Sequence, residues 1–209
     1  MTSFIRPEYA AIAQWVTPGA KVLDLGCGDG SLLKYLREAR QARGYGIEIA
    51  DGNIAASIRN GVNVIQMDLE SGLSGFEAQS FDFVILSQTL QAMKNIEQLV
   101  SEMLRVGQHV IVTLPNFSYW RHRLQILSGN MPVSEDLPYQ WFDTPNIHLC
   151  TFDDFEAFCR ERGVTILERR VMHNDRVVSL LPNLLGSLAV YRLNRERQEK
   201  VTGHPASAG

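Results

Sequence analysis

Cysteine is scarce in this sequence of 209 residues, which contains only Cys27, Cys150 and Cys159. The three cysteines are odd in number and form no CxxC or CxC pair. Neither a disulfide framework nor a structural zinc site is therefore expected, and we predict no bound metal. Unpaired thiols are typical of the reducing cytoplasm, which is the compartment that we expect.

A surplus of basic residues is also absent, because 20 Lys and Arg stand against 23 Asp and Glu, for a formal charge of -3. A dedicated nucleic-acid-binding protein carries a basic footprint, so no nucleic-acid partner is expected. No run of about 18 apolar residues occurs, and the N-terminal "MTSFIRPEYAAIAQWV" lacks the pattern of a signal peptide. We therefore expect no membrane partner, while the composition leaves the oligomeric state open.

The length of the chain suits one domain of ordinary size. We place that domain at residues 1–195. The remaining 14 residues, 196–209, contain almost no apolar side chain that a core would bury, so we expect a flexible C-terminal tail.

Strand-like and helix-like segments alternate along the chain, which predicts a doubly wound, Rossmann-like α/β fold. Apolar positions at helical spacing, with Pro7 in the first turn, predict a lead-in helix. Asn95 and Gln98 suit a capping box, Thr151 suits an N-cap, and Gly163 suits a helix end. We expect seven strands, at 21–25, 44–49, 62–68, 81–88, 109–116, 164–172 and 188–193. The last two strands are expected to pair antiparallel at one edge of the sheet. The helices are expected at 7–16, 53–60, 95–105 and 151–163, with another beginning near residue 31.

The glycine-rich segment "VLDLGCGDG", residues 22–30, follows the first expected strand and leads into a helix. Such a turn lets a ligand approach the bare backbone at the carboxyl end of a strand. A dinucleotide-binding GxGxxG pattern fails here, because Ser31 stands where the third glycine or an alanine is needed. Asp24 would repel a pyrophosphate but attract an ammonium group, which argues against a nicotinamide-dependent reductase.

Two further acids end the next two strands. Glu48 lies about 20 residues after the glycine loop, where a carboxylate can accept hydrogen bonds from both ribose hydroxyls. Asp68 can accept from an adenine amine, with Leu69 packing on the ring. The alternative for each acid is a helix cap or a solvated side chain, and Asp29 suits a cap for the helix near Ser31. A nucleoside joined to an amino acid describes S-adenosylmethionine (SAM).

The chain at this point resembles the class I SAM-dependent methyltransferases, through "VLDLGCGDG", "GYGIEI" and "VIQMDL". The resemblance implies a strand order of 3-2-1-4-5-7-6 with the seventh strand antiparallel, and it implies SAM or S-adenosylhomocysteine as the cofactor. It assigns the loop glycines to the methionine portion, Glu48 to the ribose and Asp68 to the adenine. The full set of expected cofactor-binding residues is Asp24, Gly26, Cys27, Gly28, Gly30, Glu48, Ile49, Asp68, Leu69 and Ser87.

Three longer strings, "FDFVILSQTLQAMKN", "LPNFSYWRHRLQ" and "PYQWFDTPNIHLCT", resemble the methionine biosynthesis protein family called MetW. This resemblance covers most of the chain. It implies a methyltransferase-like protein that works beside a homoserine O-acyltransferase in making methionine. In some bacteria the family supports the acyltransferase reaction instead of methylating a known acceptor.

An insert of about 35 residues, 116–150, separates the fifth strand from the helix at Thr151, and its length favours a cap or a contact surface. Trp120, Leu124 and Leu127 fall on one side of a short cap helix. This helix either packs its aromatic side inward and solvates Arg121 and Arg123, or uses Tyr119, Trp120 and these arginines to bind an anion. After it, Tyr139, Trp141 and Phe142 form a rigid aromatic loop that either closes over SAM or meets a partner.

A catalytic base is needed only if a methyl acceptor arrives protonated, and His148 and Asp143 are the candidates, with His122 third. The string "LSQTLQ" stands where amino-directed nucleic-acid methyltransferases have Asn-Pro-Pro-aromatic, which argues against such substrates. Ser87 and Gln88 can still contact the ligand. Two functions stay open: a SAM-binding partner of a homoserine O-acyltransferase, or an active methyltransferase on an unidentified small molecule.

Overall fold

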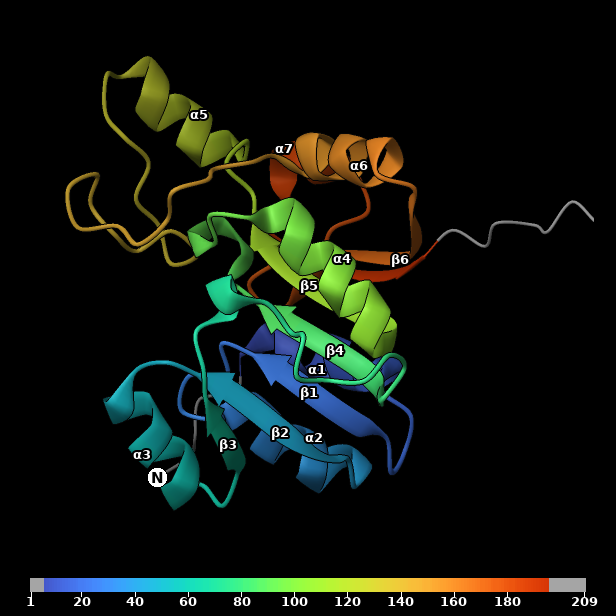
Figure 1. Ribbon diagram of the computed structural model, residues 1–209. Coiled ribbons are helices and arrows are strands. Elements are labelled where there is room, and N and C mark those ends of the chain that lie inside the picture. Colours follow the sequence, from blue (N-terminus) through green and yellow to red (C-terminus); the bar gives the residue numbers. More distant parts are fainter. Residues whose placement is uncertain (1–5, 196–209) are drawn as a thin grey trace, which may run out of the picture.

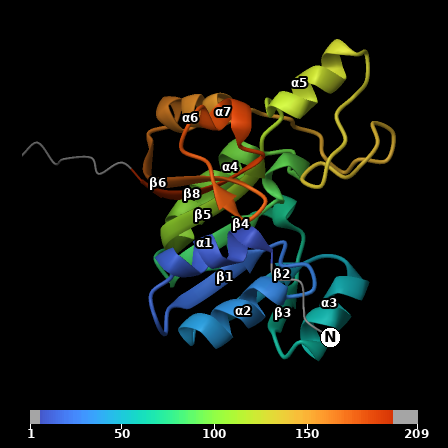
Figure 2. The same ribbon diagram turned by 180° about the vertical axis from the view of Figure 1, so that it is seen from behind.

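The computed structural model describes residues 6–195, so the C-terminal tail that we expected to be flexible lies outside the described residues. The described chain forms an eight-stranded mixed sheet with helices on both faces (Figures 1 and 2). The strands are β1 (Lys21–Leu25), β2 (Arg43–Glu48), β3 (Asn63–Gln66), β4 (Phe81–Ser87), β5 (Gly107–Pro115), β6 (Val164–His173), β7 (Arg176–Val177) and β8 (Leu188–Arg195).

The strand order is β3-β2-β1-β4-β5-β8-β6-β7. The first five strands in this order are parallel, and β8 pairs antiparallel with β5 and with β6. This confirms the α/β fold and the order expected for seven strands. The expected number of strands is wrong, because β7 adds an eighth strand through Met172↔Val177 and His173↔Arg176. Two residues after a tight turn at Asn174 are too short a run to carry a strand pattern.

Helices α4 and α6 cover one face of the sheet, and α1 and α2 cover the other (Figures 1 and 2). The helices are α1 (Pro7–Trp15), α2 (Ser31–Arg40), α3 (Asp51–Arg59), α4 (Ile96–Val106), α5 (Trp120–Leu127), α6 (Phe152–Glu161) and α7 (Pro182–Leu185), with short 3-10 turns η1 (Leu69–Ser71) and η2 (Leu90–Ala92). Among the described residues, no helix is long and apolar enough to cross a membrane.

The helix ends follow local hydrogen bonding. Thr151 and Asp154 form the capping box of α6, and Gly163 follows its end with φ +62°. The capping box expected at Asn95 is wrong, because the Asn95 side chain makes no capping bond and its Nδ2 donates to Glu70 instead, at 3.4 Å.

Strand β1 occupies the middle of the sheet, and Val22, Leu23 and Leu25 on it are completely buried. Burial on both faces explains its nearly continuous apolar sequence. Asp24 interrupts that run yet is only 2% exposed, so the core contains one carboxylate at the point where β1 runs into the glycine loop. The insert that carries α5 lies beyond the carboxyl ends of the strands (Figure 1).

Candidate functional site

A cavity of about 930 Å³ lies at the carboxyl ends of the parallel strands. Its walls come from the glycine loop after β1, the end of β2, the segment after β4, the start of α1, the insert and the turn between β6 and β7. This is the position at which open α/β sheets bind ligands, and the volume falls in the range of about 300–1,000 Å³ for small-molecule sites.

The glycine loop lines the cavity. Its glycines adopt left-handed backbone conformations that residues with a side chain disfavour. Gly26 has φ +67°, and a Cβ there would lie 2.9 Å from the Thr89 side chain. Gly28 has φ +57° and open space where a side chain would stand, and its N–H donates to Glu48 Oε2 at 2.9 Å. Glycine therefore leaves backbone exposed to a ligand at this turn.

Asp24 is a deeply buried acid of the cavity wall, 2% exposed. Its Oδ1 has no hydrogen-bond partner within the described chain. Burial, together with the nearby charge of Glu48, raises the Asp24 pKa to about 8. A buried acceptor without a donor suits a cationic group of a ligand, which would both donate a hydrogen bond and favour the ionised carboxyl.

Glu48 is 8% exposed and helps to hold the loop in place. Its Oε2 accepts from the Gly28 N–H, while its Oε1 accepts from the N–H groups of Ile49 and Ala50 at 2.8 and 2.9 Å. A carboxylate offers about four acceptor positions, so roughly one remains for a ligand hydroxyl. Glu48 thus fits the ribose role while also fixing the loop.

Cys27 and Ser87 also line the cavity, as the sequence suggested. Burial raises the pKa of the Cys27 thiol to about 12, so this thiol stays protonated and contributes shape, not a nucleophile. The Ser87 hydroxyl shares a hydrogen bond with Thr113 Oγ1 at 3.1 Å. Asp29 lines the cavity as well, while its Oδ1 accepts from the Ser31 N–H at 3.0 Å, which is the capping role considered for it.

The other expected cofactor-binding residues do not line this cavity. Gly30 adjoins it at the start of α2, and Ile49 is an exposed apolar side chain next to Glu48. Asp68 is exposed, and its Oδ1 accepts from the Glu70 N–H at 2.9 Å at the start of η1. Leu69 packs against the core. Asp68 therefore makes a capping hydrogen bond, and its adenine role stays a prediction.

The structure brings neither candidate base to the 930 Å³ cavity. His148 lines a separate apolar cavity of about 290 Å³, and its backbone N–H donates to the Gln91 carbonyl at 3.0 Å. Asp143 is exposed and accepts from the Gln140 N–H within its own loop. His122 is fully buried, with one ring nitrogen 3.0 Å from the Asn116 carbonyl and the other 2.9 Å from Ser134 Oγ, so it joins α5 to the parts of the insert before and after the helix.

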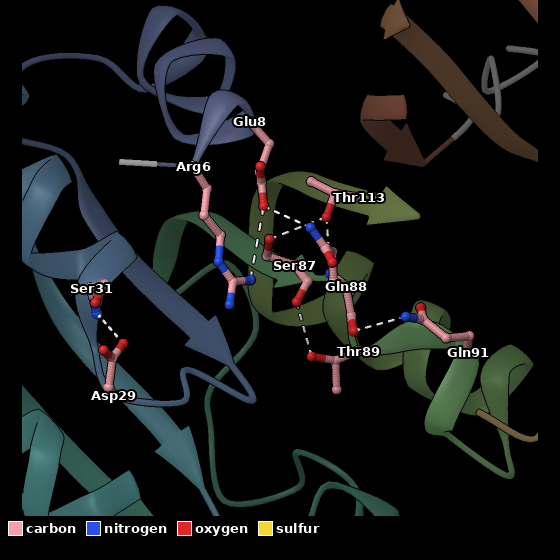
Figure 3. Close-up of polar contacts among 9 residues, drawn as sticks. All are labelled: Arg6, Glu8, Asp29, Ser31, Ser87, Gln88, Thr89, Gln91 and Thr113. Atoms are coloured by element: carbon pink, nitrogen blue, oxygen red, sulfur yellow. Dashed lines mark hydrogen bonds and ion pairs between the residues drawn. The ribbon is translucent and has the colours of Figure 1, made fainter. Parts of the chain in front are cut away.

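The cavity instead contains an acid that sequence reasoning missed. Glu8, on the first turn of α1, is 2% exposed and accepts from Gln88 Nε2 at 2.7 Å, with Arg6 4.0 Å away (Figure 3). Burial raises its pKa above the ordinary value. The available signal was spacing, because Glu8 stands four residues before the buried Ile12 and so faces the body of the protein.

Gln88 and Gln91 connect Glu8 to the end of β4. Gln88 adopts φ +52°, and its N–H donates to Thr113 Oγ1 at 2.9 Å. Gln91 Nε2 donates to the Gln88 carbonyl at 2.9 Å, whereas the buried Gln91 Oε1 has no partner within the described chain (Figure 3). Gln88 was expected to contact a ligand, but Gln91 was not singled out.

Helix α5 does not pack its apolar side inward, which was one of the two alternatives for it. Trp120, Leu124 and Leu127 are 38%, 53% and 82% exposed. The helix buries His122 instead. Helical spacing shows that apolar residues share a face but not whether the same chain covers it.

Comparison with known proteins identifies the family. The profile of the family described as "Methionine biosynthesis protein MetW" matches residues 6–193. The chain belongs to the MetW family. A bifunctional methionine biosynthesis protein MetXA/MetW of Rhodopirellula baltica is 35% identical over 202 residues, covering 90% of this chain and 32% of that protein. This MetW chain thus spans about a third of the length of that relative.

Solved structures show the fold that MetW shares with other proteins. A SAM-dependent methyltransferase of Thermotoga maritima, described as a possible histamine N-methyltransferase, superposes with a TM-score of 0.65 at 17% identity, over 91% of this chain and 88% of that one. A SAM-dependent methyltransferase of Mesorhizobium loti gives 0.65 at 15% identity, over 90% and 98%. The fold of this MetW protein is that of class I SAM-dependent methyltransferases. Among its described residues, no group of three or more His, Cys, Asp or Glu is placed to hold a metal ion.

Proposed function

We propose that this protein binds SAM, or its product S-adenosylhomocysteine, in the 930 Å³ cavity and acts with a homoserine O-acyltransferase in methionine biosynthesis. The observation that carries the partnership is the Rhodopirellula baltica relative, whose name joins MetXA and MetW in one bifunctional chain. Two functions fused in one protein are commonly performed by separate, associating chains elsewhere. We propose that the MetXA part corresponds to the acyltransferase.

The chemistry of the cavity wall supports SAM as the cofactor. Asp24 offers a buried, unpartnered oxygen to the ammonium group of the methionine portion, and the glycine loop gives that portion open backbone to lie against. Glu48 keeps an acceptor position for a ribose hydroxyl. When bound, SAM supplies a methyl group on a positively charged sulfur, and the acids around it favour that charge.

Exposed apolar side chains of the insert support the partnership. They are Trp120, Leu124 and Leu127 on α5, and Trp141 and Phe142 in the loop after it. Trp141 and Phe142 are 73% and 69% exposed, with their rings packed edge to face at 5.7 Å between centroids. Large exposed aromatic groups of this kind are typical anchors of protein interfaces.

The test is the activity of the purified homoserine O-acyltransferase with and without this protein, each in the presence and absence of SAM. We expect activity to rise on addition, and Trp141→Ser combined with Phe142→Ser to abolish both this effect and co-purification. Leu180→Ser, which changes a side chain that is 73% exposed but lies outside the insert, is the matched control and should leave both unchanged. No effect of the wild-type protein on the acyltransferase would refute the partnership.

A second function, methyl transfer to a small molecule, is favoured by the extent of the cavity, which continues past the glycine loop to Glu8 and the insert. It predicts release of S-adenosylhomocysteine in the presence of an acceptor and its loss in Gly26→Arg. A panel of acceptors that gives no release above the rate without acceptor would count against it.

A further inference from the structure

The cavity has a second half that the cofactor roles do not explain. Asp24, Glu48 and the glycine loop form one side. The other side is formed by Glu8 from α1, by the segment after β4, by the turn at 174–175 and by six residues of the insert: Glu135, Asp136, Pro138, Tyr139, Pro145 and Asn146. These segments are far apart in the sequence, and all of them line this cavity.

The second half is acidic. Glu8, Glu135, Asp136 and Asp175 line it, while Arg6 is the one basic side chain within residues 6–195 that reaches the wall. Arg6 is half exposed and approaches Glu8 Oε1 only to 4.0 Å, the outer limit of an ion pair. Glu8 and Asp136 both line this space, and the charge of Asp136 adds a small part to the rise in the Glu8 pKa that burial mainly causes. A negative excess of this kind favours a cationic ligand.

A buried acceptor without a donor, Gln91 Oε1, is an independent observation. Gln91 is 9% exposed and lines both this cavity and the apolar cavity of about 290 Å³, and its Oε1 has no hydrogen-bond partner in the described chain. Its Nε2 is already committed to the Gln88 carbonyl, so Oε1 is the atom that a ligand would satisfy. A buried acceptor without a donor costs about 1–3 kcal/mol, and a ligand with an N–H group would remove that cost.

Glu8 is held in a fixed position. Gln88 Nε2 binds one of its oxygens, and Gln88 is itself fixed by the Thr113 hydroxyl and by Gln91 (Figure 3). The left-handed conformation of Gln88 is a strained one for a residue other than glycine, and such strain is concentrated at functional sites. Among residues 6–195, no other side chain donates a hydrogen bond to Glu8, so its second oxygen is the one offered to a ligand.

We propose that the Glu8 side of the cavity binds a small molecule through a primary or secondary ammonium group, with Glu8 as its anchoring carboxylate and Gln91 Oε1 accepting one of its N–H bonds. The site lies beside the proposed cofactor site, so the inference deepens the proposed function by naming the chemical class of its second ligand. A quaternary ammonium group fits less well, because it has no N–H to give to Gln91.

The experiment is calorimetric titration of the folded protein with butane-1,4-diamine, with and without saturating S-adenosylhomocysteine. Butane-1,4-diol provides a neutral control, and the fully methylated quaternary diamine provides a cation without N–H groups. We expect saturable binding of the diamine, no binding of the diol, and binding of the quaternary compound that is at least about tenfold weaker, equivalent to about 1.4 kcal/mol.

Variants distinguish binding of the diamine at this site from a general attraction of cations to an acidic protein. Glu8→Gln keeps the shape of the side chain, and we expect diamine binding to weaken at least about tenfold. Asp136→Asn, a half-buried position, should weaken it in the same direction even if Glu8→Gln unfolds. Glu38→Gln removes one charge from an exposed position of α2 and is the matched control, with wild-type binding expected.

Equal diamine binding by Glu8→Gln, Asp136→Asn and Glu38→Gln would overturn the proposal, as would equal affinity for the quaternary compound or no saturable binding up to about 10 mM. The titration without S-adenosylhomocysteine keeps this outcome separate from the proposed function. A protein that binds the diamine but not S-adenosylhomocysteine refutes the cofactor and supports Glu8, and the reverse result refutes Glu8 alone.

Discussion

Replacing Asp24 by Asn should stabilise the ligand-free protein at alkaline pH while removing SAM binding. Asp24 is completely buried, and burial together with Glu48 raises its pKa from 3.8 to about 8. In the unfolded chain the same carboxyl titrates near its ordinary value. Between these two pH values the folded protein holds a proton that the unfolded chain has lost.

The sign of the effect follows from this proton. Because the folded state binds more protons, stability falls as the pH rises through the window from about 4 to 8. One fully retained proton changes the free energy of unfolding by about 1.4 kcal/mol for each pH unit. From pH 5 to 8 we therefore expect the wild-type protein to lose about 2–4 kcal/mol relative to Asp24→Asn, which carries no titrating group at this position.

Urea unfolding of both proteins at pH 5, 6, 7 and 8 measures this difference, with Glu38→Gln as a variant that loses a charge at an exposed position. The stability curves of wild type and Glu38→Gln should run parallel, while that of Asp24→Asn diverges upward with pH. If wild type and Asp24→Asn stay parallel, Asp24 is ionised throughout and already has a compensating partner. A cationic ligand would then not be needed to compensate the Asp24 carboxylate, which refutes this role for the ligand.

Three other substitutions or modifications test further parts of the structure. Gly26→Ala puts a Cβ at φ +67° against Thr89, so we expect a loss of about 1–2 kcal/mol in urea unfolding and loss of SAM binding by calorimetry. Thr151→Ala removes the cap of α6 and should cost about 1 kcal/mol without changing SAM affinity, which distinguishes it from the loop variant. Cys27 is 8% exposed with a thiol pKa of about 12, so a thiol reagent at pH 8 should label it only on unfolding, and fast labelling of the folded protein would contradict its burial.

Much of the fold could be predicted because its strands are buried on both faces. The apolar runs around Leu23 and Val112 are unlike any exposed segment, and the glycine loop separates strand from helix at a fixed point. Strand β7 could not be predicted, since two residues carry no periodicity. The capping box at Asn95 was wrong, since the Asn95 side chain makes no capping bond and its Nδ2 donates to Glu70, which is distant in sequence.

The candidate site, like the fold, could be predicted from the sequence only in part. Asp24 and Glu48 were predictable because each ends a strand next to a recognisable loop. Glu8 was missed because an acid in the first turn of a helix usually interacts with the helix dipole and stays in solvent. Only the tertiary structure shows that α1 points this turn toward β4, where Gln88 binds the carboxylate. The exposed face of α5 likewise depends on what packs against it, and a partner outside the chain leaves no trace in the spacing.

The acids of the cavity affect one another within each half. Burial first and then the charge of Glu48 raise the pKa of Asp24, while burial and, to a smaller extent, Asp136 raise the pKa of Glu8. Without a ligand, these carboxyls oppose folding when ionised. A cation bound in one half stabilises the ionised acids of that half. Two cationic ligands in one cavity also repel each other, so we expect the proposed cofactor and the proposed second ligand to bind without positive cooperativity.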